Sequence, residues 1–253
     1  MRPKRIEIQR SLSLVGVFAA WETAAKLGWV DIHLAPPPSH VLRALYELTV
    51  SGDLVRDVRE SWLRLVMGLC AGVLSGVGIG LMTGRMRQLD SALTPIIQFV
   101  RPLPPVALIP LMIVWFGIGD PAKVVAIAVA VFFPVWVGTH LGARSVAREY
   151  LWSAQLLTRS TVRIVGTVVF PAALPTIIAG VRTAIPVAFV MIYVSELAGA
   201  SAGLGYEIAV SHLAYRIDRM LAALVLLGAS GAVTDALFGM FVRWRWPWLL
   251  TVR

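Results

Sequence analysis

Charged side chains are scarce in this chain of 253 residues, and that scarcity excludes an ordinary soluble domain. Only 15% of the residues are charged and 58% are hydrophobic, whereas a soluble globular domain carries about 25% charged residues. The mean hydropathy is +0.77, and the apolar residues come in long blocks separated by short polar segments. Such blocks are typical of helices that span a bilayer. We therefore predict an all-α, polytopic membrane protein that forms one domain over residues 1–253.

Cysteine and metal-binding patterns are also nearly absent. The single cysteine, Cys70, lies in an apolar block and cannot form an intramolecular disulfide, so we interpret it as a small packing residue. The histidines are far apart in the sequence and show no spacing typical of metal ligands. We predict no metal site on this chain. These histidines are His33, His40, His140 and His212.

Catalytic patterns are missing as well. No G-x-x-x-x-G-K-[ST] stretch is present, so the chain cannot hydrolyse ATP by a phosphate loop of the usual kind. Apart from scattered histidines and two glutamates, no catalytic groups converge in or beside the apolar blocks, which disfavours an integral membrane enzyme. Residues 1–120 and 121–253 show no convincing repeat, whereas a gradient-driven carrier commonly has repeated halves. We predict no catalytic residues and keep the carrier and the enzyme as alternatives.

The apolar blocks indicate about six transmembrane helices, because each block offers about 20 mostly apolar residues. The third block is interrupted by "RPLPP" at 101–105, and the fifth contains Pro186. Backbone breaks of this kind need partners in protein or in a water-lined cavity, which favours a transport protein over a simple anchor. The predicted spans are 11–29, 62–83, 95–116, 122–141, 175–197 and 219–242.

The formal net charge of +9 comes from arginines in the gaps between the blocks. They form neither a face nor a run, so we expect no nucleic acid partner. Placing both termini in the cytoplasm puts the most basic gaps there, as the positive-inside rule requires. The opposite gap at 30–61 is balanced in charge, and its segment "LAPPPSHVLRALYEL" predicts an amphipathic helix on the outer face with Ser39 as its N-cap.

Glycines at intervals of four predict a packing seam in the second span. Their spacing places them on one helix face, where another backbone can approach closely. The pattern fits a contact within the chain and a contact between chains equally well. These glycines are Gly68, Gly72, Gly76 and Gly80.

Between the fourth and fifth spans lies a basic segment that is longer than a turn requires. Residues 147–157 and 160–169 each have apolar residues on one side and arginines around them, which indicates an interfacial helix pair or a docking element for a soluble partner. We expect Pro171 and Pro175 to terminate these short helices and make them rigid.

This segment resembles the coupling loop of membrane subunits in ATP-binding-cassette importers, whose motif is E-A-A-x-x-x-G followed after nine residues by I-x-L-P. The second alanine and the proline match Ala154 and Pro171, whereas the glutamate and the glycine do not match. The equivalent residues here are Trp152, Ser153, Ala154, Thr158, Val168, Phe170 and Pro171. The resemblance implies ATPase-coupling roles for Leu151, Trp152, Ala154, Leu157, Thr158, Arg159, Phe170 and Pro171.

Further stretches resemble the nitrate/sulfonate/taurine/bicarbonate type of importer permease. They include "PPPSHVL" at 36–42, "ESWLRLVMG" at 60–68, "RPLPPVALIPLMIVWFGIG" at 101–119 and "SELAGASAGLGYEI" at 195–208. The resemblance implies a type I ABC importer permease fold with a cytoplasmic coupling loop over residues 142–174. It also implies a multi-pass subunit of the bacterial inner membrane that forms the translocation path for a small anion or small polar organic solute.

The same resemblance implies the partners. They are two cytoplasmic ATP-binding-cassette subunits, which hold ATP and magnesium, a second permease chain, and a periplasmic or lipid-anchored substrate-binding protein. No cofactor is expected on this chain. The second permease is either an identical copy or a divergent paralogue.

The two departures from the coupling motif bear on that choice. A β-branched residue such as Thr158 tolerates a positive φ poorly, so either the turn is built differently or the docking is altered. Trp152 replaces a charged contact by a large apolar one. These changes suggest a second permease with the intact motif, an ATPase with a changed groove, or a poorly coupled subunit.

Two acidic residues and a glycine-rich segment are the candidates for the pathway and its gate. Glu22 and Glu196 lie nearest to span interiors, where an ionisable residue indicates function, although both fit an outer interface with a basic partner equally well. The small residues after Glu196 favour a gate-forming segment. The remaining candidates for pathway and gate are Gly203, Gly205, Tyr206, Pro104 and Pro105.

Overall fold

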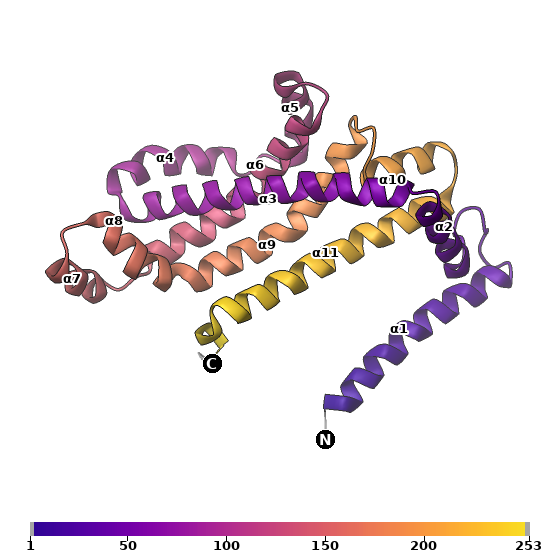
Figure 1. Ribbon diagram of the computed structural model, residues 1–253, viewed down its shortest axis with the longest axis horizontal. Helices are drawn as coiled ribbons and strands as arrows, with labels where there is room; N and C mark the ends of the chain where they lie inside the picture. The colour runs from indigo at the N-terminus through magenta and orange to yellow at the C-terminus, as the bar shows by residue number, and fades with distance from the viewer. Residues whose placement is uncertain (1–2, 251–253) are drawn as a thin grey trace.

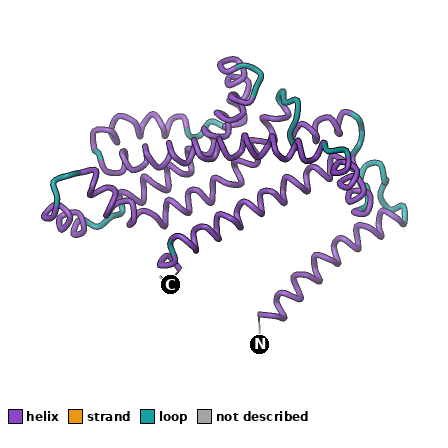
Figure 2. Tube along the Cα trace, viewed as in Figure 1, coloured by secondary structure: helices purple, strands orange, loops and turns teal. Residues whose placement is uncertain are grey.

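Helices form nearly all of the computed structural model, which describes residues 3–250, with side chains from residue 15 to residue 249 (Figure 2). The helices are α1 Pro3–Lys26, α2 Pro38–Val50, α3 Asp53–Arg85, α4 Arg87–Val100, α5 Ile109–Phe116, α6 Asp120–Arg144, α7 Arg148–Leu157, α8 Thr161–Ile164, α9 Phe170–Leu197, α10 Leu204–Leu213 and α11 Ile217–Arg245. The all-α prediction is confirmed for this part of the chain.

Four of the six predicted spans lie in continuous apolar helices. The spans 62–83, 122–141 and 219–242 fall within α3, α6 and α11, and the span 175–197 falls within a continuous helix from Thr161 to Leu197. Each helix has at least 25 residues and a mean hydropathy of 1.9 or more in its most apolar window. At 1.5 Å per residue, each is long enough to cross a hydrocarbon core of about 30 Å.

The third predicted span, 95–116, is wrong as a single helix. The chain forms α4, a turn, a short 3-10 segment at Pro105–Leu108 and α5, and the two halves meet at an angle of 91°. Pro104 has extended backbone angles of φ −62° and ψ 120°. Because neither Pro104 nor Pro105 has an N–H to donate, the helical ladder cannot continue through this pair. The bent pair is a broken span or a re-entrant segment.

The first predicted span, 11–29, ends three residues too late. Helix α1 ends at Lys26, and Gly28 follows with a φ of +75°, a left-handed conformation that glycine adopts easily and that stops a helix. By the measure that selects the four spans above, α1 is not apolar enough to be counted with them. It extends away from the other helices and approaches them at α2 (Figure 1).

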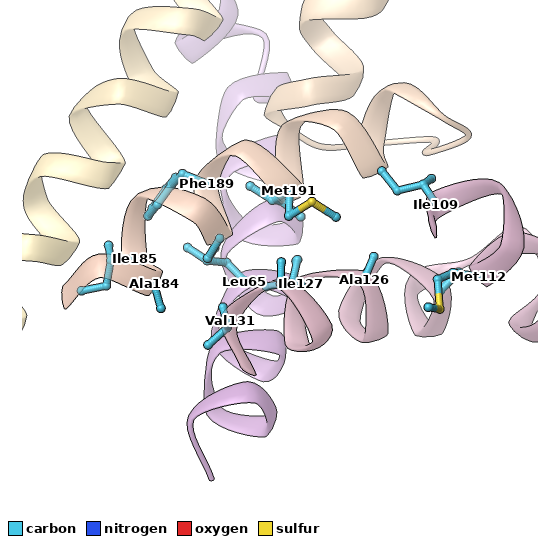
Figure 3. Close-up of a cluster of buried hydrophobic side chains, with 14 of the residues drawn as sticks. Leu65, Ile109, Met112, Ala126, Ile127, Val131, Ala184, Ile185, Phe189 and Met191 are labelled. Carbon is cyan, nitrogen blue, oxygen red and sulfur yellow. The ribbon is translucent and has the colours of Figure 1, made fainter. Parts of the chain in front are cut away.

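Helices α3, α6 and α9 pack side by side and enclose the main core. Leu65 on α3, Ile127 and Val131 on α6, and Ile185 and Phe189 on α9 meet there, and all five are at least 91% buried (Figure 3). Their side chains interdigitate between the three helices. Because lipid is as apolar as this core, such close packing is what holds the helices together in a bilayer.

The predicted glycine seam is present, and it lies within the chain. Each glycine of the seam faces a side chain of α6 that is also repeated every four residues. A Cβ built on Gly68 would lie 2.6 Å from Ile127 Cβ, and one built on Gly72 would lie 2.6 Å from Val131 Cβ. The repeat continues in Gly76 opposite Val135, Gly80 opposite Thr139 and Gly84 opposite Ala143. This seam lets the α3 and α6 backbones approach closely along most of their length.

The expectation that Pro171 and Pro175 terminate short helices is wrong. Both lie in a helix that continues from Thr161 to Leu197, so residues 160–169 are not a separate helix. Residues Val165–Val169 form a π-helical segment immediately before Pro171. A π turn widens the helix by one residue per turn, which gives the proline ring room against the preceding carbonyl groups.

The predicted helix in 30–61 is confirmed as α2, but Ser39 is not its cap. The N-cap is Pro37, and its side chain makes no capping bond. Instead, the Ser39 backbone N–H and Oγ donate to the carboxylate of Glu22 on α1, at 3.1 and 2.8 Å. A carboxylate at a helix N-terminus satisfies free N–H groups and favours the helix dipole.

Candidate functional site

Arg64 lies at the centre of a buried polar cluster at one end of the bundle. Its Nη1 donates to Glu196 Oε1 at 2.8 Å and to the carbonyl oxygen of Ala202 at 2.7 Å. Its Nε donates to Asp120 Oδ1 at 2.6 Å. Arg64 is 4% exposed and Glu196 is 1% exposed. One guanidinium thus ties α3 to α6, to α9 and to the segment that follows α9.

That following segment, 198–203, is held against α3 by two more side chains. Asp57 Oδ1 accepts from the Gly203 N–H at 2.8 Å, and Ser61 Oγ accepts from the Leu204 N–H at 2.9 Å. Ser61 Oγ in turn donates to the Glu196 carboxylate at 2.8 to 2.9 Å. We call the set of Asp57, Ser61, Arg64, Glu196 and residues 202–205 the polar latch.

The latch requires glycine at two of the predicted gate positions. Gly203 has a φ of +135°, and a Cβ there would collide with the carboxylate of Glu196. Gly205 donates its N–H to Glu196 Oε2 at 2.8 Å, and a Cβ there would lie 2.7 Å from the carbonyl oxygen of Tyr193. The structure therefore brings Glu196, Gly203 and Gly205 together. Tyr206 is half-buried on the first turn of α10, directly beside them.

Sequence reasoning missed the α3 half of the latch and its contact on α6. Asp57, Ser61 and Arg64 follow one another at intervals of four and three residues, which places them on one helix face. Polar residues at this spacing, at the start of an apolar block, could have indicated a polar helix face that binds a partner. Asp120 gave no signal, because its role depends on the fold that brings α6 beside α3.

Glu22 lies away from the latch and makes local contacts. Besides its bonds to Ser39, it pairs with Lys26 at 2.9 Å, one turn along α1. It joins α1 to α2, and its predicted place in a pathway stays a prediction.

A surface pocket of about 390 Å³ lies beside α2, lined by charged side chains that include Arg43, Glu47, Arg216 and Asp218. Arg216 donates to Asp218 at 3.0 and 3.1 Å, and this hydrogen bonding raises the pKa of Arg216. Tyr215, beside it, is 87% exposed and has a φ of +53°.

At the opposite end of the bundle, α7 projects beyond the long helices (Figure 1). Leu151 and Ala154 point into the protein and are 7% and 8% exposed. Leu151 packs with Val146 and Val169 against the ends of α6 and the Thr161–Leu197 helix. Trp152 and Leu157 point outward and are 59% and 88% exposed. Among the predicted coupling residues, Leu151 and Ala154 thus anchor α7, whereas Trp152 and Leu157 belong to an exposed apolar surface.

The turn after α7 is built without a left-handed residue. Thr158 is extended, with φ −156° and ψ 142°, and its Oγ1 accepts from the Ser160 N–H at 3.2 Å. Ser160 then caps α8 by accepting from the Arg163 N–H. Arg159 is exposed between them, and Phe170 and Pro171 are half-buried at the start of α9. The replacement of glycine by threonine is therefore compatible with a well-formed turn.

Pro104 and Pro105 lie at the bend between α4 and α5. Pro104 is exposed, and Pro105 lines a groove of about 550 Å³ between this bend, α6 and α9. Arg101, Thr176 and Thr183 line the same groove. The broken span thus borders an open space that contains polar side chains.

Comparison with known proteins agrees with this arrangement. The family described as "Binding-protein-dependent transport system inner membrane component" matches residues 76–246. The aliphatic sulfonates transport permease protein SsuC of Bacillus subtilis (strain 168) is 30% identical over 92% of this chain and 84% of its own length. The taurine transport system permease protein TauC of Escherichia coli (strain K12) is 31% identical over 93% of this chain and 88% of its own.

Solved structures show the same fold. A chain of the MetNI methionine ABC transporter, in an inward-facing conformation, superposes with a TM-score of 0.62 at 22% identity and covers 75% of this chain and 94% of that chain. A chain of an amino acid ABC transporter gives a TM-score of 0.58 at 18% identity, over 78% and 94%. The resemblance seen in the sequence is confirmed, and ATP hydrolysis belongs to a separate subunit. The chain belongs to the family of inner-membrane components of binding-protein-dependent transport systems, as a multi-pass permease subunit of an ABC importer.

Proposed function

We propose that this permease imports a small organic anion of the sulfonate class. It works in a complex of two identical permease chains, two cytoplasmic ATPase subunits that hold ATP and magnesium, and an external substrate-binding protein. The exposed apolar surface of α7 is the observation that carries this proposal. It gives one end of the bundle a feature suited to a soluble partner, which supports this end as the one that meets the ATPase.

The outward face of α7 supports ATPase docking. Leu156 and Leu157 are 89% and 88% exposed, Trp152 is 59% exposed, and Val162 on α8 is 84% exposed. Large apolar side chains gathered on a short helix, outside any span, indicate a protein contact. Arg148, Arg159 and Arg163 lie around them, which supports a cytoplasmic location for this end by the positive-inside rule.

The arrangement of the termini supports the same orientation. The N-terminal end of α1 and the C-terminal end of α11 both point away from α2 and α10 (Figure 1). Arg243 and Arg245 lie in the last turn of α11. Both termini are therefore assigned to the cytoplasm. The polar latch and α2 then lie at the outer face, where a binding protein delivers the substrate.

A rigid connection joins the two ends. Leu151 of α7 packs with Ala143 of α6 and Val169 of the Thr161–Leu197 helix. The same α6 meets α3 along the glycine seam, and α9 carries Glu196 of the latch at its far end. Because packed helices move as units, a displacement of α7 by the ATPase is transmitted to the latch. We assign the latch as the outer gate.

Two further points support the identical pair and the cargo. The turn at Thr158 is well formed, so this departure from the motif does not require a second permease with the intact motif. The relatives named for sulfonates and taurine are similar over nearly the whole chain, which favours cargo of that chemistry over the neutral solutes that other permeases carry.

Native mass spectrometry of the complex, purified through a tag on this chain and co-expressed with its neighbouring genes, tests the composition. The proposal predicts two copies of this chain with two ATPase subunits. A single copy paired with a different permease contradicts the identical pair. A complex without any ATPase contradicts the coupling role of α7.

A further inference from the structure

A second strong ion pair lies outside the latch, between α9 and α11. Arg182 Nε donates to Asp235 Oδ1 at 2.9 Å, and Arg182 Nη2 donates to Asp235 Oδ2 at 2.8 Å. This is a bidentate fork, the geometry in which a guanidinium binds two oxygens of one anionic group.

The pair lies within the membrane-spanning region. On the α7 side, the predicted span 175–197 begins at residue 175 and the predicted span 219–242 ends at residue 242. Arg182 and Asp235 each lie seven residues inside these limits. At 1.5 Å per residue, both are about 10 Å inside those limits. Charged side chains at such depth face protein or water and not lipid, because lipid offers them no partners.

In the single chain, however, the pair is open to its surroundings. The Arg182 side chain is 64% exposed and the Asp235 side chain is 38% exposed. Arg182 belongs to a continuous exposed stripe of α9, which consists of Thr176, Ala179, Arg182, Thr183, Pro186 and Val190. Because this face carries a charge at such depth, it must meet protein or water in the assembled complex.

Grooves flank this stripe on both sides. On the α11 side, Asp235 lines a groove of about 410 Å³ whose other lining residues are mainly apolar. On the α6 side, Thr176 and Thr183 line the groove of about 550 Å³, together with Arg101. Arg182 thus bonds to Asp235 on one side of the stripe, and a second guanidinium and two hydroxyl groups line the groove on the other side. Guanidinium and hydroxyl groups are donors that suit an oxyanion.

We propose that Arg182 binds the anionic group of the cargo within the translocation path, exchanging Asp235 for a sulfonate or a similar oxyanion. This inference rests on the proposed function. When no cargo is present, Asp235 holds the guanidinium in place and balances its charge, so that the pair is neutral overall. A sulfonate presents two oxygens with a spacing similar to a carboxylate, so the exchange preserves the fork and never leaves Arg182 unpaired. The released Asp235 faces its groove, where it can pair with an ammonium group of a zwitterionic cargo.

Cysteine labelling tests this site without knowledge of the natural cargo. In a Cys70→Ala background, Thr183→Cys places a thiol next to Arg182 on the exposed stripe. The assembled complex in nanodiscs is treated with a negatively charged methanethiosulfonate reagent, with and without ethanesulfonate. We expect labelling, and we expect ethanesulfonate to slow it at least threefold. In the same background with Arg182→Gln and Asp235→Asn, the protection should disappear.

A matched control neutralises a pair far from the stripe. Arg43→Gln with Glu47→Gln removes an exposed pair on α2 whose N–O distance is 3.2 Å, and it should leave the protection intact. Absence of labelling at Thr183→Cys, or equal protection with and without the Arg182–Asp235 pair, overturns the proposal. Protection that requires the pair supports it.

Uptake measured in parallel separates this inference from the proposed function. With a binding protein loaded with taurine, the wild-type complex should accumulate taurine at the expense of ATP. The neutralised Arg182–Asp235 variant should move at least tenfold less taurine per ATP hydrolysed. If the wild type imports taurine and the variant does so equally well, this inference fails while the proposed function holds. If sulfonate protection is seen but no sulfonate is imported, the proposed cargo fails.

Discussion

Arg64 and Glu196 form a salt bridge of 2.8 Å between α3 and α9, and both side chains are removed almost completely from solvent. Removing one partner of a buried pair leaves an uncompensated charge, which costs about 3–5 kcal/mol. We therefore expect Arg64→Met to lower the free energy of unfolding of the permease in nanodiscs by that amount. Glu196→Leu should lower it less, because Arg64 keeps its ion pair with Asp120. The double variant should lose less than Arg64→Met alone, because no Glu196 carboxylate is left without Arg64.

The exposed pair of Arg43 and Glu47 provides the comparison for this prediction. Its side chains are 80% and 39% exposed, and exposed pairs contribute at most about 1 kcal/mol. Arg43→Gln should change the melting temperature little. Equal losses for Arg43→Gln and Arg64→Met would show that the latch does not hold α3 to α9.

The glycine seam predicts strong sensitivity to one added methyl group. In Gly72→Ala the new Cβ would lie 2.6 Å from Val131 Cβ and 2.7 Å from the carbonyl oxygen of Ala128. The helices must then separate, and overpacking of this kind costs about 1–3 kcal/mol. Gly78→Ala, on the same helix with no atom within 4 Å of the new Cβ, should be neutral or slightly stabilising. Thermal unfolding of both variants measures the difference, and equal stability would contradict the seam.

Substitution of the latch glycine Gly203 by alanine should be more harmful than the same substitution at Gly52, where only the backbone conformation requires glycine. Gly203→Ala adds strain at φ +135° and a collision with the Glu196 carboxylate, whereas Gly52→Ala adds strain at φ +83° in open space. Strain alone costs about 1–3 kcal/mol. We expect Gly52→Ala to keep binding-protein-stimulated ATPase activity and Gly203→Ala to lose most of it. The reverse order would remove the latch from the gating role.

The turn at Thr158 predicts that restoring the family's glycine brings no gain. Because Thr158 is extended and its hydroxyl accepts from Ser160, Thr158→Gly loses a hydrogen bond and gains backbone freedom. We expect ATPase coupling to stay the same or to fall. A clear increase in substrate moved per ATP would show that the turn is a defect of this chain.

Much of the fold could be predicted because it depends on local patterns. The apolar blocks gave the long helices, and glycines spaced by four gave the α3 face that meets α6. The sequence could not tell whether that face met the same chain, since Ile127 and Val131 carry the complementary repeat in a block of ordinary apolar residues.

Two of the errors concern prolines, whose effect on a helix depends on the backbone around them. Pro171 follows a π segment and continues the helix, whereas Pro104 and Pro105 stand next to each other and break it. The sequence predicted only the part of the latch formed by Glu196 and its glycines, because these residues are neighbours in the chain. Arg64 is 132 residues away from Glu196, so only the fold brings it there.

The central claim is that α7 meets the ATPase and that the latch end faces the binding protein. Photocrosslinking measures this directly, with the reactive residue placed at Leu157 in one variant and at Leu213 in another. Leu157 is 88% exposed on α7, and Leu213 is 78% exposed at the end of α10. In the assembled complex, we expect adducts with the ATPase subunit from position 157 alone and adducts with the binding protein from position 213 alone. Adducts with the ATPase from position 213, or none from position 157, would contradict the account.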